Sequence, residues 1–231
     1  YHQAMGLKKQ RKYKEAIGVY QDGFREVLGA MEGAREDKES WRSFLRHLKE
    51  RGLTGCRMFT SDKCLGLVES LPEFYPDAGW QRCVVHWYRS VLRQVPSKKK
   101  KIVAAMLKAI HAQEDRLAAM GKAMDVVDKL RAMKLGKAAD LVESSYRETM
   151  TYFRFPRDHW RRIRTNNPME RVILEIKRRT KVVGAFPDGK SALMLAGARL
   201  RHIAGTRWSS RRYLCMDHLH EMETGGEPDT A

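Results

Sequence analysis

Apolar and polar residues in the first fifty positions predict a hairpin followed by an amphipathic helix. Two short apolar runs between residues 15 and 30 are separated by Asp22-Gly23, a dipeptide that favours a tight turn between strands. From Asp37 to Arg51 the spacing becomes helical, and Gly52 follows as a stop. The apolar positions of this expected helix are Trp41, Phe44, Leu45 and Leu48.

The pattern then predicts two further strands, each followed by a helix. The expected elements are a strand at 56–60 that ends in Ser61-Asp62, a helix at 65–71 broken by Pro72 and Pro76, a strand at 81–85, and a helix at 87–95. Strands and helices that alternate in this way indicate an α/β fold.

Residues 98–152 contain no proline and only two glycines, and they are rich in Ala, Met, Leu, Lys and Glu. This composition predicts consecutive helices without strands. The lysine run 98–101 is interpreted as a solvated helix terminus, with phosphate contact as the less favoured alternative. The aromatic pairs Trp87-Tyr88 and Tyr152-Phe153 are expected in the core rather than as platforms for stacked bases.

The C-terminal part predicts two more helices. Asn167-Pro168 supplies a helix cap and a first-turn proline, and Gly184 with Pro187 ends the helix. Its apolar stripe consists of Met169, Val172, Ile173 and Ile176. A second helix is expected at 191–203, and the polar tail after Glu221 is expected to be disordered.

Charge narrows the range of functions. The chain has 45 Lys and Arg against 28 Asp and Glu, a net charge of +17. Thirteen of the basic residues but only four acidic ones lie at 154–201, which favours nucleic acid as the partner over a merely solvated cationic surface. Four cysteines are too few for a disulfide scaffold, and no apolar stretch is long enough to span a membrane. A reducing cytoplasm is expected.

Two acids are candidates for metal chemistry. Asp62 follows a strand, although it could instead cap the helix near Leu65. Glu170 could close a capping box with Asn167, but it is also an isolated acid among basic residues. Those basic residues, expected to contact nucleic acid, are Arg161, Arg162, Arg164, Arg171, Lys177, Arg178, Arg179 and Lys181. Two Mg²⁺ ions that cleave a phosphodiester need carboxylates converging from separate segments, as Asp62 and Glu170 could.

Cys83 and His86 form half of a zinc-ligand pattern. Cys64 or His159 could complete it, but no second pair with ligand spacing exists. A buried cysteine and a hydrogen-bonded histidine at a strand end are the simpler interpretation.

The runs 155–171 and 175–187, which include Thr165-Asn166-Asn167-Pro168-Met169-Glu170-Arg171, closely resemble the C-terminal signature of Mutator-type insertion-sequence transposases of the DDE family. Three further segments agree in order: Glu39-Ser40-Trp41 with residues 48–53, Ser61-Asp62 with Gly66-Leu67, and residues 81–86. The resemblance extends from Ala16 to Leu219.

The resemblance implies an RNase H-like core, a mixed sheet flanked by helices, interrupted by an all-helical insertion. The expected divisions are 1–86 (first part of the core), 87–155 (insertion), 156–205 (second part of the core) and 206–231 (C-terminal segment). Asp62 and Glu170 match two catalytic, metal-binding acids, and Cys83 and His86 match the family's Cys-x-x-His motif near the site. The implied activity is cleavage of element ends and strand transfer with Mg²⁺ or Mn²⁺. The implied partners are terminal repeats, target DNA and further copies of the chain, in a cytoplasmic, nucleoid-associated protein.

Two features depart from the family pattern. The first catalytic Asp aligns at or just before Tyr1, so we expect an N-terminal truncation that impairs cleavage and lacks the terminal-repeat binding region. Ile173 occupies a place where the family usually has a polar residue, often Asn. The alternatives are a non-catalytic DNA-binding remnant that inhibits or pairs with a full-length transposase, and an RNA-binding protein, which rests on charge alone.

Overall fold

The computed structural model describes residues 4–10, 13–32, 37–183 and 186–224, and its centre is a mixed five-stranded sheet. The strand order is β3-β2-β1-β4-β5. Strands β1, β2 and β3 are antiparallel neighbours, whereas β1, β4 and β5 run parallel. The strands are β1 (Ala4–Gln10), β2 (Tyr13–Val19), β3 (Arg25–Glu32), β4 (Met58–Ser61) and β5 (Gly79–Arg82).

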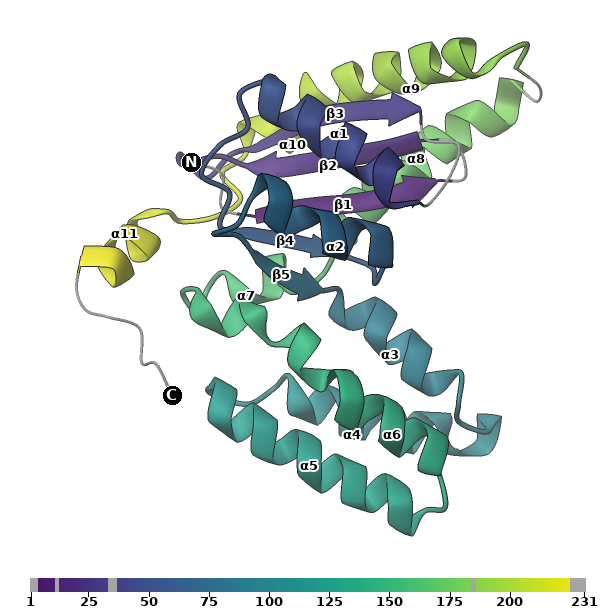
Figure 1. The fold of residues 1–231 in the computed structure, drawn as a ribbon, viewed down its shortest axis with the longest axis vertical. Coiled ribbons are helices and arrows are strands. Elements are labelled where there is room, and N and C mark those ends of the chain that lie inside the picture. Colours follow the sequence, from purple (N-terminus) through teal and green to yellow (C-terminus); the bar gives the residue numbers. More distant parts are fainter. Residues whose placement is uncertain (1–3, 11–12, 33–36, 184–185, 225–231) are drawn as a thin grey trace.

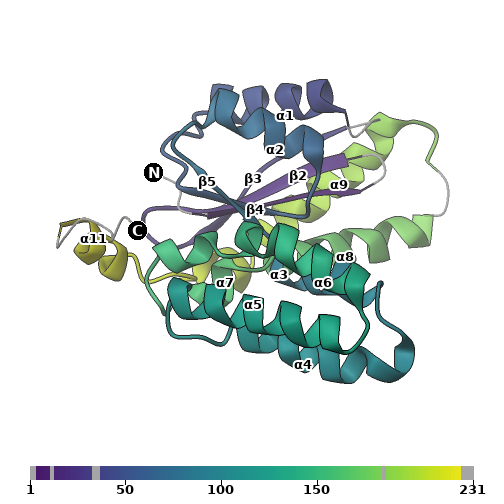
Figure 2. The same cartoon turned by 60° about the horizontal axis from the view of Figure 1, so that its bottom comes forward.

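Helices cover both faces of the sheet (Figures 1 and 2). Because side chains alternate along a strand, Ala16 packs against α1 (Lys38–Glu50) and α2 (Leu65–Phe74) on one face. Its neighbour Ile17 packs on the other face with α8 (Asn167–Val183) and α9 (Gly189–Ala204). All four predicted apolar positions of α1 are buried, and so is the whole predicted stripe of α8.

The predicted hairpin is present, and the C-terminal part of the chain holds its turn. Gly23 adopts a φ of +82°, a conformation that favours glycine. Its carbonyl accepts hydrogen bonds from the backbone N–H groups of Tyr213 (2.7 Å) and Leu214 (3.1 Å). A Cβ at this position would overlap the carbonyl oxygen of Leu214. The turn therefore serves as a docking point for a segment about 190 residues away.

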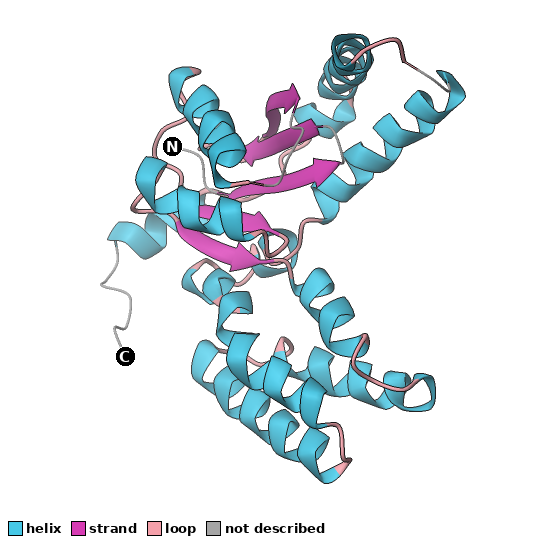
Figure 3. Cartoon of the chain, turned by 45° about the vertical axis from the view of Figure 1, so that its right-hand side comes forward, coloured by secondary structure: helices cyan, strands magenta, loops and turns pink. Residues whose placement is uncertain are grey.

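Between β5 and α7 (Trp160–Ile163) the chain forms a helical bundle apart from the sheet, as predicted from its composition (Figure 3). Its core extends from Trp87 to Met150, and both predicted aromatic pairs contribute buried or half-buried rings. The bundle consists of α3 (Val84–Leu92), η1 (Ser97–Lys99), α4 (Lys100–Ile110), α5 (Arg116–Ala132), α6 (Gly136–Ser145), η2 (Tyr146–Thr149) and η3 (Thr151–Arg154).

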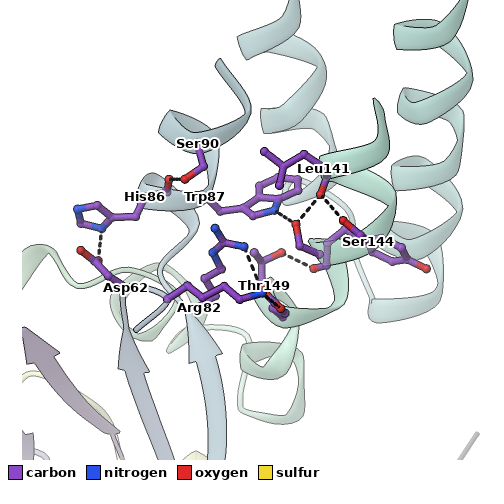
Figure 4. Close-up of polar contacts among 12 residues, drawn as sticks. Asp62, Arg82, His86, Trp87, Ser90, Leu141, Ser144 and Thr149 are labelled. Carbon is purple, nitrogen blue, oxygen red and sulfur yellow. Dashed lines mark hydrogen bonds and ion pairs between the residues drawn. The ribbon is translucent and has the colours of Figure 1, made fainter. Parts of the chain in front are cut away.

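Buried polar contacts join the bundle to the end of β5. The side-chain amide of Gln81 donates to the carbonyl of Thr149 (2.9 Å) and its oxygen accepts from the N–H of Tyr152 (3.0 Å). The indole of Trp87 donates to the hydroxyl of Ser145 at 2.8 Å (Figure 4). These hydrogen bonds therefore join the helical bundle to the sheet next to Asp62.

Several predicted boundaries were wrong. Helix α2 continues through Pro72 to Phe74, and β5 ends at Arg82 because Val84 already begins α3. Helix α8 includes Asn167, so it begins at the residue predicted as its cap. Gly184, the predicted helix stop, lies outside the described residues.

The C-terminal segment contains two short helices, α10 (Arg207–Ser210) and α11 (Asp217–Thr224). Helix α11 runs three residues past Glu221, where the tail was predicted to be disordered; residues 225–231 lie outside the described part. Among the described helices, none is both long and apolar enough to cross a membrane.

A buried histidine in the bundle makes stability depend on pH. Burial and, secondarily, the positive charge of Arg164 lower the pKa of His111 from 6.5 to about 3. The ring lies 2.9 Å from both the Tyr88 and the Thr149 hydroxyls. Because the folded pKa is below the unfolded one, the unfolded chain takes up a proton that the folded chain does not. This contribution to stability is present above pH 6.5 and is lost as the pH falls towards 3.

We therefore expect His111 to make the protein about 2 kcal/mol less stable at pH 5 than at pH 7, at 1.36 kcal/mol per pH unit below 6.5. Urea unfolding at the two pH values measures this loss. In His111→Gln, which keeps a polar side chain but does not titrate, the loss should be smaller by about that amount. An equal loss in both proteins would show that His111 is not the group responsible.

Candidate active site

Asp62 stands at the end of a buried strand beside the start of a helix. Every residue of β4 is buried, and the N–H of Cys83 donates to the carbonyl of Ser61 at 2.8 Å, which brings the ends of β4 and β5 together. The residue at the cap position of α2 is Cys64 rather than Asp62. The carboxylate of Asp62 is thus not used for the capping role considered from the sequence.

His86 contacts both candidate acids. It lies in the first turn of α3, and its Nδ1 is 2.6 Å from Oδ1 of Asp62 (Figure 4). On the opposite side of the ring, Nε2 is 3.4 Å from Oε1 of Glu170. The imidazole therefore stands between two carboxylates that are 108 positions apart in the sequence.

Backbone contacts of the segment before α8 position Glu170. The hydroxyl of Thr60 in β4 donates to the carbonyl of Ile163 at 2.8 Å, and the N–H of Val84 donates to the carbonyl of Arg164 at 3.1 Å. The N–H of Asn166 then donates to Sγ of Cys83 at 3.3 Å. These bonds fix the start of α8 against β4 and α3, so Glu170 in its first turn faces His86.

The site favours a positively charged imidazole. The contact with Asp62, followed by that with Cys83, raises the pKa of His86 to about 9. Burial by itself would raise the pKa of the Cys83 thiol, but hydrogen bonds from His86 and from the Asn166 N–H outweigh it and lower that pKa below its usual value. The raised pKa favours the protonated imidazole, whose Nε2 also lies 3.3 Å from the guanidinium of Arg89.

The predicted basic residues differ in their surroundings. Arg162 and Arg164 are used within the fold: the first donates to the Tyr213 carbonyl, and the second donates to the His111 carbonyl at 2.7 Å. Arg178 and Arg179 pair with Glu175. The side chains of Arg161, Arg171, Lys177 and Lys181 are exposed.

Neither residue considered as completing a zinc pattern with Cys83 and His86 is near them. Sγ of Cys64 accepts a hydrogen bond from the indole of Trp41 (3.1 Å). The ring of His159 contacts the carbonyl of Cys215 (2.7 Å). In the described part of the chain, the group of possible metal ligands that forms is Asp62, Cys83 and His86.

Sequence reasoning missed a second ionic group next to the site. Glu148 of η2 pairs with Lys63 (2.6 Å) and with the buried Arg82 (2.9 Å). Lys63 follows Asp62 directly and Arg82 precedes Cys83, so this network borders the candidate site. A charged residue at the last position of a strand, Arg82, was the available signal.

Strand β1 lies beside β4, where the family resemblance led us to expect the first catalytic Asp nearby. Leu7 of β1 pairs with Ser61 of β4, the residue before Asp62. Strand β1 has the sequence Ala-Met-Gly-Leu-Lys-Lys-Gln and carries no acid. The expected position of the first Asp, at or before Tyr1, lies outside the described residues.

Comparison with known proteins decides the family. A family model described as "Transposase, Mutator family" matches residues 5–209, most of the chain. The chain belongs to the Mutator family of transposases. The resemblance inferred from the motif around Glu170 is therefore confirmed.

Several curated transposases are similar to the chain. The transposase of insertion sequence IS1081 from Mycobacterium tuberculosis is 36% identical over 204 residues, which cover 88% of this chain and 49% of that protein. The ISRM5 transposase of Rhizobium meliloti is 34% identical, covering 89% and 52%. The IS256 transposase of transposon Tn4001 from Staphylococcus aureus is 34% identical, covering 87% and 52%. The chain thus spans about half the length of these transposases.

Proposed function

We propose that this chain carries the catalytic core of a DDE transposase, which cuts the ends of its DNA element and joins them to target DNA. The observation that carries the proposal is the convergence of Asp62 and Glu170, from separate segments, on the two nitrogens of His86. A mixed sheet flanked by helices and followed by a helical bundle supports an RNase H-like arrangement of that core.

Asp62 and Glu170 are suited to hold Mg²⁺ or Mn²⁺. Both offer the oxygen ligands that these cations prefer, and their side chains are partly open to solvent, 38% and 27% exposed. Oδ1 of Asp62 has the imidazole of His86 as its ion-pair partner. When bound there, such an ion would stabilise negative charge on the phosphate and make water a stronger nucleophile.

The residues around the acids have separate roles in this proposal. His86 offsets the repulsion between the two carboxylates, since a cation lies between them. The exposed Arg171, Lys177 and Lys181 on α8 would bind the phosphates of the DNA strand that enters the site. The Lys63–Glu148–Arg82 network fixes the bundle next to the acids.

The test is cleavage of DNA that carries an element end. We expect strand nicking with Mg²⁺ or Mn²⁺, none with a chelator, and DNA binding that weakens steeply as salt rises. The assay is run on this chain and on a form extended by the sequence encoded upstream of Tyr1. Nicking that persists in the chelator would contradict the proposal.

DNA binding without cleavage is the second candidate function. It is favoured by β1, which pairs with β4 beside Asp62 but offers no carboxylate. A protein of this kind would bind end DNA and leave it uncut in both the original and the extended form. Cleavage that appears only in the extended form would instead support the catalytic core.

A further inference from the structure

The candidate site contains a mixed set of ligands that a magnesium site does not need. Asp62 follows β4, Cys83 follows β5, and His86 lies three residues later in the first turn of α3. The carboxylate oxygen, the thiol sulfur and the ring nitrogen of these residues all lie within 4.8 Å of one another. The spacing of Cys83 and His86 puts both on the same side of the helix start, facing Asp62.

The sulfur of Cys83 is buried and accepts a backbone hydrogen bond. Its side chain is buried at 1% exposure, and the N–H of Asn166 donates to its sulfur at 3.3 Å. The buried sulfur is thus held within reach of the Asp62 oxygen and the His86 nitrogen, where it can serve as a metal ligand.

We propose that Asp62, Cys83 and His86 form a binding site for Zn²⁺, distinct in chemistry from the magnesium site but sharing Asp62 with it. Thiolate and imidazole ligands select zinc over magnesium, which takes oxygen ligands almost alone. Zinc accepts sulfur, nitrogen and oxygen together in a tetrahedral set, with water or a further residue in the fourth place. Binding displaces the proton between His86 and Asp62, because only the neutral ring can ligate a metal.

Because the two metal sites share Asp62, zinc can regulate DNA cleavage. This step rests on the proposed function. Because Asp62 belongs to both ligand sets, zinc and magnesium compete for it. Zinc at this site therefore inhibits cleavage, and added magnesium relieves the inhibition. The concentration of free zinc would then determine how strongly DNA cleavage is inhibited.

Binding is tested on the purified chain with Co²⁺ as a spectroscopic probe and Zn²⁺ as competitor. We expect a sulfur-to-cobalt charge-transfer band that Zn²⁺ abolishes at one equivalent. Cys83→Ser should lose the band, and its Zn²⁺ affinity should fall by about tenfold or more. Cys215→Ser is the matched control, because that cysteine also lies beside a carboxylate, Asp217 at 3.7 Å, and it should retain the band.

Further variants keep the outcomes distinct. His86→Asn should lower Zn²⁺ affinity while retaining part of the sulfur band, and circular dichroism shows whether each variant is folded. A band that survives in folded Cys83→Ser, or disappears in Cys215→Ser, overturns the proposed site. Glu170→Gln should abolish cleavage yet keep the band, so failure of the catalytic proposal does not affect this readout. If cobalt binds at Cys83 but zinc does not slow cleavage, the proposed competition between zinc and magnesium is wrong. The proposed zinc site would still stand.

Discussion

Glu170→Gln is expected to reduce metal-dependent cleavage of element-end DNA by about a thousandfold or more. The substitution preserves the shape of the side chain but removes the negative charge that would hold the cation, and loss of one essential group commonly costs orders of magnitude in rate. Initial rates of nicking, measured on the cleavage-competent form at fixed Mn²⁺ concentration, give the ratio directly.

Glu175→Gln is the matched control for this variant. It lies on the same helix, but its carboxylate pairs with Arg178, Arg179 and Arg199 rather than with His86. We expect its cleavage rate to stay within a few-fold of the unmodified protein. Asp62→Asn combined with Glu170→Gln should be hardly slower than either single variant, since the two acids act as one unit. Equal rates for the Glu170 and Glu175 variants would remove Glu170 from the site.

Trp87→Ala is expected to cause the largest loss of stability, about 3 to 5 kcal/mol, as is usual when a large buried aromatic side chain is truncated. The ring is fully buried in the core of the bundle, and its indole N–H donates to Ser145. Urea unfolding at pH 7 measures the loss. Since Trp87 is next to His86 in α3, cleavage should fall with the folded fraction.

Trp87→Phe separates packing from hydrogen bonding. It keeps an aromatic ring in the cavity but leaves the Ser145 hydroxyl without the indole donor, so we expect it to lose less than half as much stability as the Ala variant. A Phe variant as unstable as the Ala variant would mean that the hydrogen bond, rather than the buried volume, dominates at this position.

The helices and the hairpin could be predicted because their signals are local. The spacing of Trp41, Phe44, Leu45 and Leu48 identifies α1, and Asp22-Gly23 identifies the turn. Helix α2 was predicted to end before Pro72 because proline removes a helical hydrogen bond, yet burial of Leu71 and Phe74 on either side of it keeps the helix intact. Tertiary packing, which the local pattern does not contain, decides such boundaries.

The candidate site was only partly predictable. The motifs pointed to Asp62, Cys83, His86 and Glu170, but not to an imidazole between the two acids. That arrangement depends on which strands pair, because the Cys83–Ser61 bond sets the ends of β4 and β5 side by side. It also depends on the Thr60–Ile163 bond, which spans 103 residues. Neither of these contacts can be predicted from the spacing of residues in the sequence.

The bond from Thr60 to Ile163 and the docking of Tyr213 on Gly23 also determine the order in which parts of the chain assemble during synthesis. Contacts within the helical bundle are close in sequence, so the bundle can form as it leaves the ribosome. Glu170 is synthesised more than a hundred residues after Asp62, so the contacts that join their segments form late. The hairpin turn likewise gains its contacts with the C-terminal segment only after that segment has been made. A nascent chain therefore does not bring Asp62 and Glu170 together on His86 until α8 has been synthesised.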